Sequence, residues 1–345
     1  MRVKSTLMNF LDQLRNRFNS LKENYSLDLS SHISSRIFFF SFLIYIFLTT
    51  ILAFIWSDEP SQFEISELIV DYSKGKDRPI QNGSVVGLTL INVADILLHK
   101  PGGFISNDLT LPGIYLDNIP SWEFGVLVQV RDLSRAMRES FSRSQSQSSE
   151  DKDLAIAEPR FNFDNSSWIF PRSEDEYREG INFIKNYLNR LNQFDSSDAT
   201  FFSRADNLTF WLATVETRLG SLSQRLSASV GKRSLSEDSG EINIKTPWHQ
   251  IDNILYEARG SAWALLHFLK AVENDFQDVL NDKNALISLR QIIRELEGTQ
   301  SKIWSPVILN GSGFGLFANH SLVMASYISR ANAGIINLRE LLVKG

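Results

Sequence analysis

The sequence predicts an all-α protein in which one N-terminal transmembrane helix precedes an antiparallel helical bundle. Residues 37–56 are twenty consecutive positions without a charged residue, Pro or Gly. A helix of this length spans about 30 Å, the thickness of the hydrocarbon core of a bilayer. After this segment, apolar residues recur at spacings of three and four, the period of helices that are buried on one face.

The charges on either side of the predicted transmembrane helix indicate its orientation. Residues 1–36 carry six Lys or Arg and three acidic residues, whereas residues 57–345 carry 29 basic and 37 acidic residues. Basic flanks stay in the cytoplasm, so residues 57–345 are expected on the opposite side. The alternative, a cleaved signal peptide, would have a shorter apolar core that ends at small residues. This segment ends Ala53-Phe54-Ile55-Trp56, so we expect it to be retained as an anchor.

The chain contains no cysteine. Residues 57–345 therefore fold without disulfides, and metal sites built on thiolates are excluded. A eukaryotic ectodomain of this length without cysteine would be unusual. The sequence thus favours a bacterial inner-membrane protein with a cytoplasmic N-terminus and a periplasmic domain at 57–345.

Helix signals continue through this periplasmic domain. Ser173 and Glu176 match a capping box, and Thr246-Pro247 matches an N-cap followed by a first-turn proline. Two polar segments, 142–153 and 232–245, are predicted loops, and the second divides the helices into groups at about 84–229 and 246–345. The apolar stripes that predict the clearest helices are Tyr177, Ile181, Ile184, Leu188 and Leu191, then Leu212, Val215, Leu219, Leu222 and Leu226, then Val126, Leu127, Val130, Leu133 and Met137.

For one segment of the domain, the sequence pattern does not decide between helix and strand. Val85 to Leu98 is strongly apolar and fits a helix, but the β-branched residues within Asn82–Ile91 suit a strand as well.

The densest group of candidate binding residues lies between Gly102 and Asp132. Asn and Asp side chains order loops by local hydrogen bonds, and aromatic anchors are frequent in binding surfaces. The segment is either a docking loop or an elaborate connection between two helices. The candidate binding residues are Asn107, Asp108, Asp117, Asn118, Trp122 and Glu123.

Residues 102–138, GGFISNDLTLPGIYLDNIPSWEFGVLVQVRDLSRAMR, resemble the signature stretch of a family of proteobacterial single-pass inner-membrane proteins known as a domain of unknown function. The similarity extends over most of the chain. It implies a Gram-negative envelope location and a chain of this layout. The family has no assigned catalytic residues, so the resemblance transfers none.

Other patterns give no catalytic, metal or cofactor site. Asn92, Asp95 and His99 share one helix face, but a protein zinc site needs three or four ligands, so a solvent-facing polar stripe is the better interpretation. His249 and His267 are expected at the surface or at the edge of the core. No Gly-x-Ser-x-Gly, His-Glu-x-x-His or phosphate-loop motif occurs. The acidic charge and location of the domain exclude nucleic acid as a partner.

Three functions are compatible with these observations. The first is a membrane-anchored scaffold or accessory protein that binds an envelope protein through residues 102–124. The second is a ligand sensor that acts through a separate partner, and the third is an envelope hydrolase that uses Asp108, Asp117 and Glu123. The expected partners are the lipid bilayer and an envelope protein. The apolar stripes fit a second copy of the chain as well, so a homo-oligomer stays open.

Overall fold

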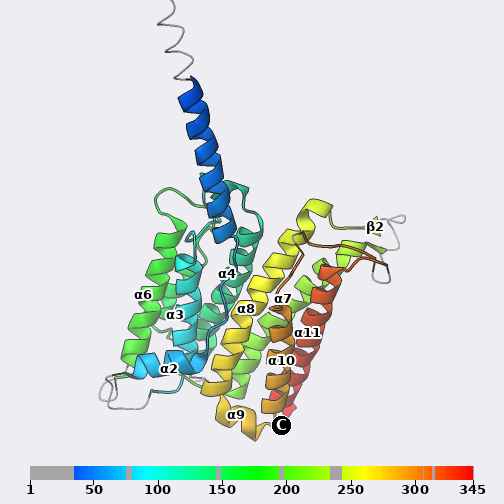
Figure 1. Ribbon diagram of the computed structural model, residues 1–345. Coiled ribbons are helices and arrows are strands. Elements are labelled where there is room, and N and C mark those ends of the chain that lie inside the picture. The colour runs from blue at the N-terminus through cyan, green and yellow to red at the C-terminus, as the bar shows by residue number, and fades with distance from the viewer. Residues whose placement is uncertain are drawn as a thin grey trace, which may run out of the picture. The chain divides into compact units, whose positions relative to one another are not determined.

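The computed structural model of the chain describes residues 35–74, 80–144, 149–193, 198–233, 243–305, 307–312 and 315–344 (Figure 1). The fold is all-α, as predicted. The chain divides into two compact units, Met1–Phe54 and Ile55–Gly345, each with its own internal contacts. All of the predicted cytoplasmic tail except its last two residues lies outside the described residues.

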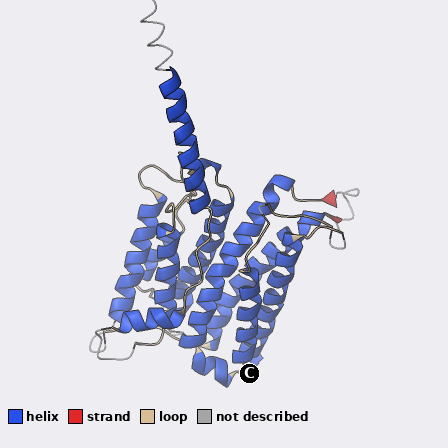
Figure 2. Cartoon of the chain, viewed as in Figure 1, coloured by secondary structure: helices blue, strands red, loops and turns tan. Residues whose placement is uncertain are grey.

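An apolar helix runs from Ser35 to Trp56 (Figure 2). Its 22 residues span about 33 Å. Large apolar side chains such as Phe38 and Phe54 are exposed along it. Its length and composition are sufficient to cross a membrane, which confirms the expected N-terminal apolar helix.

The second unit, called the helical domain here, consists of helices and short turns. One two-residue antiparallel strand pair, β1 (Lys232–Arg233) with β2 (Asn243–Ile244), is the only strand pairing in the described part of the domain. Ser84–His99 is helical, so the ambiguous segment near Ile91 is not a strand. The α-helices are α2 (Ile65–Ser73), α3 (Ser84–His99), α4 (Asn118–Ala136), α5 (Leu154–Phe161), α6 (Ser173–Leu191), α7 (Ala205–Ser227), α8 (Ile251–Asp275), α9 (Gln277–Asp282), α10 (Leu286–Thr299) and α11 (His320–Lys344).

Helix α8 lies at the centre of the helical domain. Every residue from Ala258 to Leu269 is buried, so this helix is covered on all sides. It packs against α3, α4 and α10, and its contact with α4 is the most extensive between any two helices. Small residues make this contact close: a Cβ added to Gly260 would lie 2.0 Å from the Trp122 carbonyl oxygen, and one added to Gly125 would lie 2.1 Å from that of Glu257.

The long helices pack as antiparallel neighbours. Between α7 and α11, Ser223 lies against Ser329 and Glu216 pairs with Arg339, so the residue numbers run in opposite directions. Helices α10 and α11 are also antiparallel, because Glu295 forms an ion pair with Arg330 and Gly298, further along α10, lies against Tyr327, earlier in α11. Helices before and after residues 232–245 therefore pack together within one unit, with α7 on α11 and α4 on α8.

Four loops gather at one end of the helical domain, where the segment 57–63, called the linker, begins before it runs along α8 toward α2 (Figure 1). Hydrogen bonds connect them: Asn107 bonds the Ser167 carbonyl, Asn310 bonds the Ser229 carbonyl, and Glu59 of the linker pairs with Arg259. This end is called the linker end, and its loops are the described parts of 100–117, 162–172, 228–250 and 300–319. The opposite end, which holds α2 and α9, is called the α9 end.

Helix starts differ from the predicted ones in two places. The Ser173 hydroxyl does not cap its own helix but donates to the carbonyls of Asp164 and Ser167, and Glu176 pairs with Arg160 instead of forming a capping box. Pro247 precedes a 3₁₀ turn, Trp248–Gln250, and α8 begins only at Ile251.

Helix α5 was not predicted. It has eight residues and contains Pro159. A helix this short does not let the apolar period repeat, so no pattern in the sequence marks it.

The close contact between α4 and α8 predicts a large difference between two glycine substitutions. Gly260→Ala should destabilise the protein by at least about 2 kcal/mol, because the added methyl overlaps the backbone of α4. Gly220→Ala is the matched control within α7, since its added Cβ would have its nearest neighbour at 3.6 Å. It should be neutral or stabilise by up to about 1 kcal/mol through helix propensity. Urea unfolding of the full chain in detergent, followed by circular dichroism, measures both. Equal effects would contradict the described contact.

Candidate functional site

The linker is fixed to α8, at the centre of the helical domain, by an ion pair between the buried Arg259 and the partly buried Glu59. Arg259 of α8 binds Glu59 with two nitrogens, Nε to Oε1 at 2.7 Å and Nη2 to Oε2 at 2.5 Å. Its Nη1 donates to the carbonyls of Thr299 and Ser301 at 2.9 and 3.0 Å. One guanidinium thus joins the linker, α8 and the end of α10.

A second attachment lies at the end of the linker. The Phe63 N–H donates to Nε2 of His267 at 3.1 Å, and the two rings stack with their centroids 3.9 Å apart. The other ring nitrogen, Nδ1, lies 2.7 Å from the Trp263 carbonyl. Because Nε2 accepts and Nδ1 faces a carbonyl, the pattern requires the neutral Nδ1–H form of His267.

Burial favours this neutral form as well. It lowers the pKa of His267 to about 4, and the charge of nearby Lys270 adds to this effect. The expectation that His267 lies at the surface or core edge is therefore wrong. The ring is fully buried on α8 because the linker covers it.

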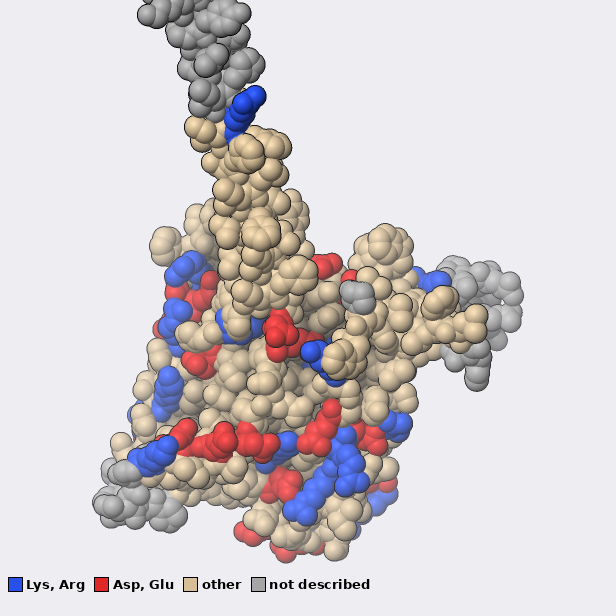
Figure 3. Space-filling model, viewed as in Figure 1, with Lys and Arg blue, Asp and Glu red and all other residues tan. Residues whose placement is uncertain are grey.

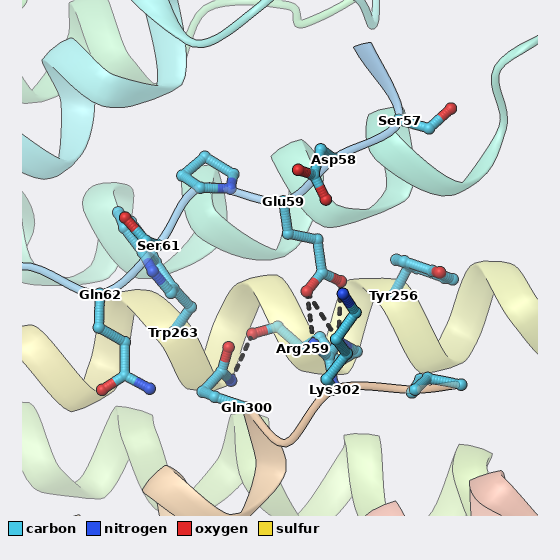
Figure 4. A pocket seen from close by; sticks show the side chains of 12 residues that line it. Ser57, Asp58, Glu59, Ser61, Gln62, Tyr256, Arg259, Trp263, Gln300 and Lys302 are labelled. Carbon is cyan, nitrogen blue, oxygen red and sulfur yellow. Dashed lines mark hydrogen bonds and ion pairs between the residues drawn. The ribbon is translucent and has the colours of Figure 1, made fainter. Parts of the chain in front are cut away.

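Three adjoining hollows lie around the described part of 300–310, and the first two border Arg259. The first, of about 430 Å³, lies between the linker and α8, with Glu59, Tyr256, Arg259 and Lys302 in its wall (Figure 4). Figure 4 shows Glu59 pointing from the linker toward Arg259, and Gln300 donating to the Arg259 carbonyl.

The other two hollows extend this region toward α11 and toward the start of α4. The second, of about 380 Å³, shares Arg259 and Lys302 with the first and is otherwise largely apolar. The third, of about 470 Å³, shares Tyr256 with the first and Ser305 with the second. The apolar residues around the second hollow are Leu255, Ile303, Trp304, Val323, Met324 and Tyr327.

The polar groups of these hollows are arranged for binding more than for proton transfer. Both Glu59 oxygens accept hydrogen bonds from Arg259, so this carboxylate already serves to hold the linker on α8. Lys302 lies over the ring of the exposed Trp304 with its Nζ 4.9 Å from the ring centre, a cation–π contact. Such a site offers apolar surface beside fixed charge.

Two of the predicted site residues, Trp122 and Glu123, lie inside the helical domain. Trp122 is fully buried and packs on Trp263 of α8 with the ring centres 5.3 Å apart. The Glu123 carboxylate is also fully buried and pairs with Lys100 at 2.6 Å. It accepts the backbone N–H groups of Ile105 and Ser106, each at 2.8 Å. Burial raises the pKa of Glu123, and Lys100 and these donors oppose that rise.

Of the remaining four predicted site residues, Asn107 is buried and the other three lie nearer the surface. Asn107 holds the loop to its neighbour through 2.8 Å bonds to the Ser167 carbonyl and the Glu174 carboxylate. Asp108 is half-buried, and burial followed by the charge of Glu174 raises its pKa. Asp117 is exposed. Asn118 lines the third hollow, and its buried Oδ1 has no hydrogen-bond partner among the described residues.

The structure therefore brings one of the six predicted residues, Asn118, to the hollows and uses Asn107 and Glu123 to order the loop. A binding role for the six stays a prediction, and the exposed Asp117 and the partly buried Asn118, at the edge of the third hollow, are the members best placed to meet a partner. Neither Asp108, Asp117 nor Glu123 lines any of the three hollows.

No group of three or more metal-binding side chains occurs within the described ranges. On the helix face considered for a metal, Asp95 and His99 form an exposed pair, with Oδ1 and Nδ1 3.2 Å apart.

Sequence analysis missed the residues that define the hollows. Glu59 and Arg259, like Phe63 and His267, are separated by about two hundred residues. No local spacing links them.

A family model described as "Uncharacterized protein conserved in bacteria (DUF2333)" matches residues 30–345. The match confirms the expected relation to a bacterial family known as a domain of unknown function, and it covers the apolar helix and the helical domain. Searches of curated proteins and of solved structures give no match.

The buried pair beneath the 102–108 loop predicts a strong effect of removing its cation. Lys100→Met should cost about 3–5 kcal/mol of stability, because the Glu123 carboxylate stays buried without its counter-ion. Lys74→Met is the matched control: Lys74 pairs with Asp71 in the open, with side chains 71% and 69% exposed, and should cost at most about 1 kcal/mol. Urea unfolding of the two variants tests this difference. Equal losses would contradict the buried pair.

The neutral state of His267 predicts how stability changes with pH. The folded pKa of His267, about 4, lies below its ordinary value of 6.5. The unfolded chain therefore binds more protons than the folded one between these values, and stability falls as pH falls through this window. Between pH 7 and pH 5 His267 should remove about 2 kcal/mol.

The measurement is the difference in unfolding free energy between the wild type and His267→Gln at each pH, because other groups cancel in this difference. The difference should be nearly constant between about pH 7.5 and pH 8.5, where His267 is almost entirely neutral in both states, and should move in favour of His267→Gln as the pH falls below about 7. A difference that does not change down to pH 5 would show that His267 is not held neutral.

Proposed function

The chain belongs to the DUF2333 family of bacterial proteins, and we propose that it is an accessory or scaffold protein of the cell envelope. The apolar helix anchors it in the inner membrane with its N-terminus in the cytoplasm. The helical domain lies in the periplasm and binds another envelope protein through the hollows at the linker end.

The anchor and its orientation are supported by the sequence around the apolar helix. The tail before the helix has a net charge of +3 and the part after it −8, the asymmetry that keeps the basic side in the cytoplasm. The absence of cysteine fits a bacterial periplasmic domain that is stabilised by a large core instead of by disulfides.

The three adjoining hollows carry the proposed binding function. Protein interfaces concentrate their energy in apolar pockets that aromatic or Arg side chains border. The second hollow has this composition, with Trp304 and Tyr327 in its apolar wall and Arg259 beside them. Asp117 and Asn118, next to the third hollow, extend the same surface to the loop predicted from the sequence.

A sensor function is the second candidate, and one observation favours it. Residues 57–62 form a wall of the first hollow and directly follow the apolar helix in the chain. A ligand in this hollow would touch the segment that leads into the helix. An envelope hydrolase has less support, because Glu123 is buried in its pair with Lys100 and none of the three proposed carboxylates lines a hollow.

The experiment that tests the proposal is photo-crosslinking in growing cells. A photoreactive amino acid replaces Trp304 or Val323, both exposed at the second hollow, in the full-length chain. The matched control position is Ile287 of α10, which is equally exposed but lies at the α9 end. We expect positions 304 and 323 to trap the same envelope protein, identified by mass spectrometry, and position 287 not to trap it.

A reciprocal crosslink from the identified protein back to the hollow confirms the contact. Alkaline phosphatase fused after residue 345 should be active, which checks the periplasmic location independently. Adducts that are absent, or identical from all three positions, would refute the partner surface, whereas an inactive fusion would refute the orientation.

A further inference from the structure

The linker end of the helical domain carries an unusual number of exposed aromatic side chains. Six of them are between 55% and 88% exposed, and they lie on four separate loops. They are Tyr115, Trp168, Phe170, Trp248, Trp304 and Phe317.

The α9 end differs sharply. None of its described loop residues, within 80–83, 141–144, 149–153, 192–193, 198–204 and 276–285, is an exposed large apolar side chain, and the exposed ones on the helices close to it, Val70, Ile287 and Val343, are aliphatic and not aromatic. On the face drawn in Figure 3, the densest band of charged side chains crosses this end, near α2 and α9. Soluble domains rarely concentrate exposed apolar groups at one end without a partner there.

The chain itself places a bilayer near the aromatic end. Trp56 is the last residue of the apolar helix and belongs to the same compact unit as the loops. Its indole lies against the loop after α3, because a Cβ at Gly102 would come within 2.7 Å of it. Glu59, three residues further on, is already fixed to Arg259, and three residues reach at most about 10 Å.

The chemistry of the six residues fits a lipid surface. Trp and Tyr are enriched at the level of lipid headgroups, where an amphipathic ring meets both hydrocarbon and water. The six are spread over four loops and do not follow one helix face, so they form scattered contacts instead of a groove for a peptide. Both Lys302 and acidic residues such as Asp117 lie among them, so charge attraction contributes little.

We propose that the linker end of the helical domain rests on the surface of the phospholipid bilayer that holds the apolar helix, with these six aromatic side chains at headgroup level. This inference rests on the proposed anchoring of the chain by its apolar helix. It adds a second membrane contact, which fixes the hollows close to the bilayer, where a membrane-embedded partner can reach them.

The absence of cysteine allows a direct test with single-cysteine variants of the full-length chain. Phe170→Cys and Phe317→Cys place an environment-sensitive fluorophore at the aromatic end, and Ile287→Cys places it at the α9 end. The labelled proteins are reconstituted without any other protein into vesicles of phosphatidylethanolamine and phosphatidylglycerol, with and without nitroxide-labelled lipid. We expect emission at 170 and 317 to shift to shorter wavelength and to be quenched by the nitroxide lipid several times more strongly than at 287.

Flotation of the vesicles separates the possible failures. If the chain floats and all three labels report water, the lipid-facing surface is refuted while the anchor stands. If the chain does not float, both the anchor and this surface are refuted. A shift in emission without quenching by the nitroxide lipid would mean that a second copy of the chain covers the loops, and it would also refute the proposal. Because no partner protein is present, none of these outcomes depends on the proposed partner.

Discussion

The guanidinium of Arg259 joins the segments that form the candidate site. It is buried within α8, and all the acceptors it uses come from elsewhere in the chain: the Glu59 carboxylate in the linker and two carbonyls at the end of α10. A buried cation that loses its partner destabilises a protein by several kcal/mol. The hydrogen bonds of the Arg259 guanidinium therefore hold both the linker and the end of α10 in place. The walls of the first two hollows are made of these segments, and their shape therefore depends on this side chain.

Much of the fold was readable from the sequence because the signals are local. The apolar helix is defined by an uninterrupted run of apolar residues, and α6 and α7 by stripes such as Tyr177, Ile181 and Ile184 that repeat within one segment. Trp122 lies four residues before Val126 and so continues the buried apolar stripe of α4. From the sequence it was assigned to a binding surface because it is aromatic. Helix starts were less predictable, because the Ser173 hydroxyl found carbonyl acceptors in a preceding loop.

The candidate site was hardly predictable because its contacts are not local. Glu59 and Arg259 occupy ordinary positions in their own segments, and only the path of the linker across α8 brings them together. The histidine that this linker covers, His267, has apolar neighbours on both sides in the sequence, a pattern that suits an edge position as well as a buried one. Even Asn118, which was singled out from the sequence, reaches a hollow only because the 3₁₀ turn at Trp248 and the chain near Ile308 lie beside it.

The pairing of α7 with α11 sets the order in which this domain can be completed. The apolar side of α7, with Leu212, Val215 and Leu219, is buried in the finished domain, and α11 is the helix that α7 contacts most extensively. The ribosome makes α11 only after α8, α9 and α10, so α7 lacks this neighbour through that whole interval. The domain is thus exposed to misassociation while it is being synthesised, and holding chaperones have their natural target on α7 during this time.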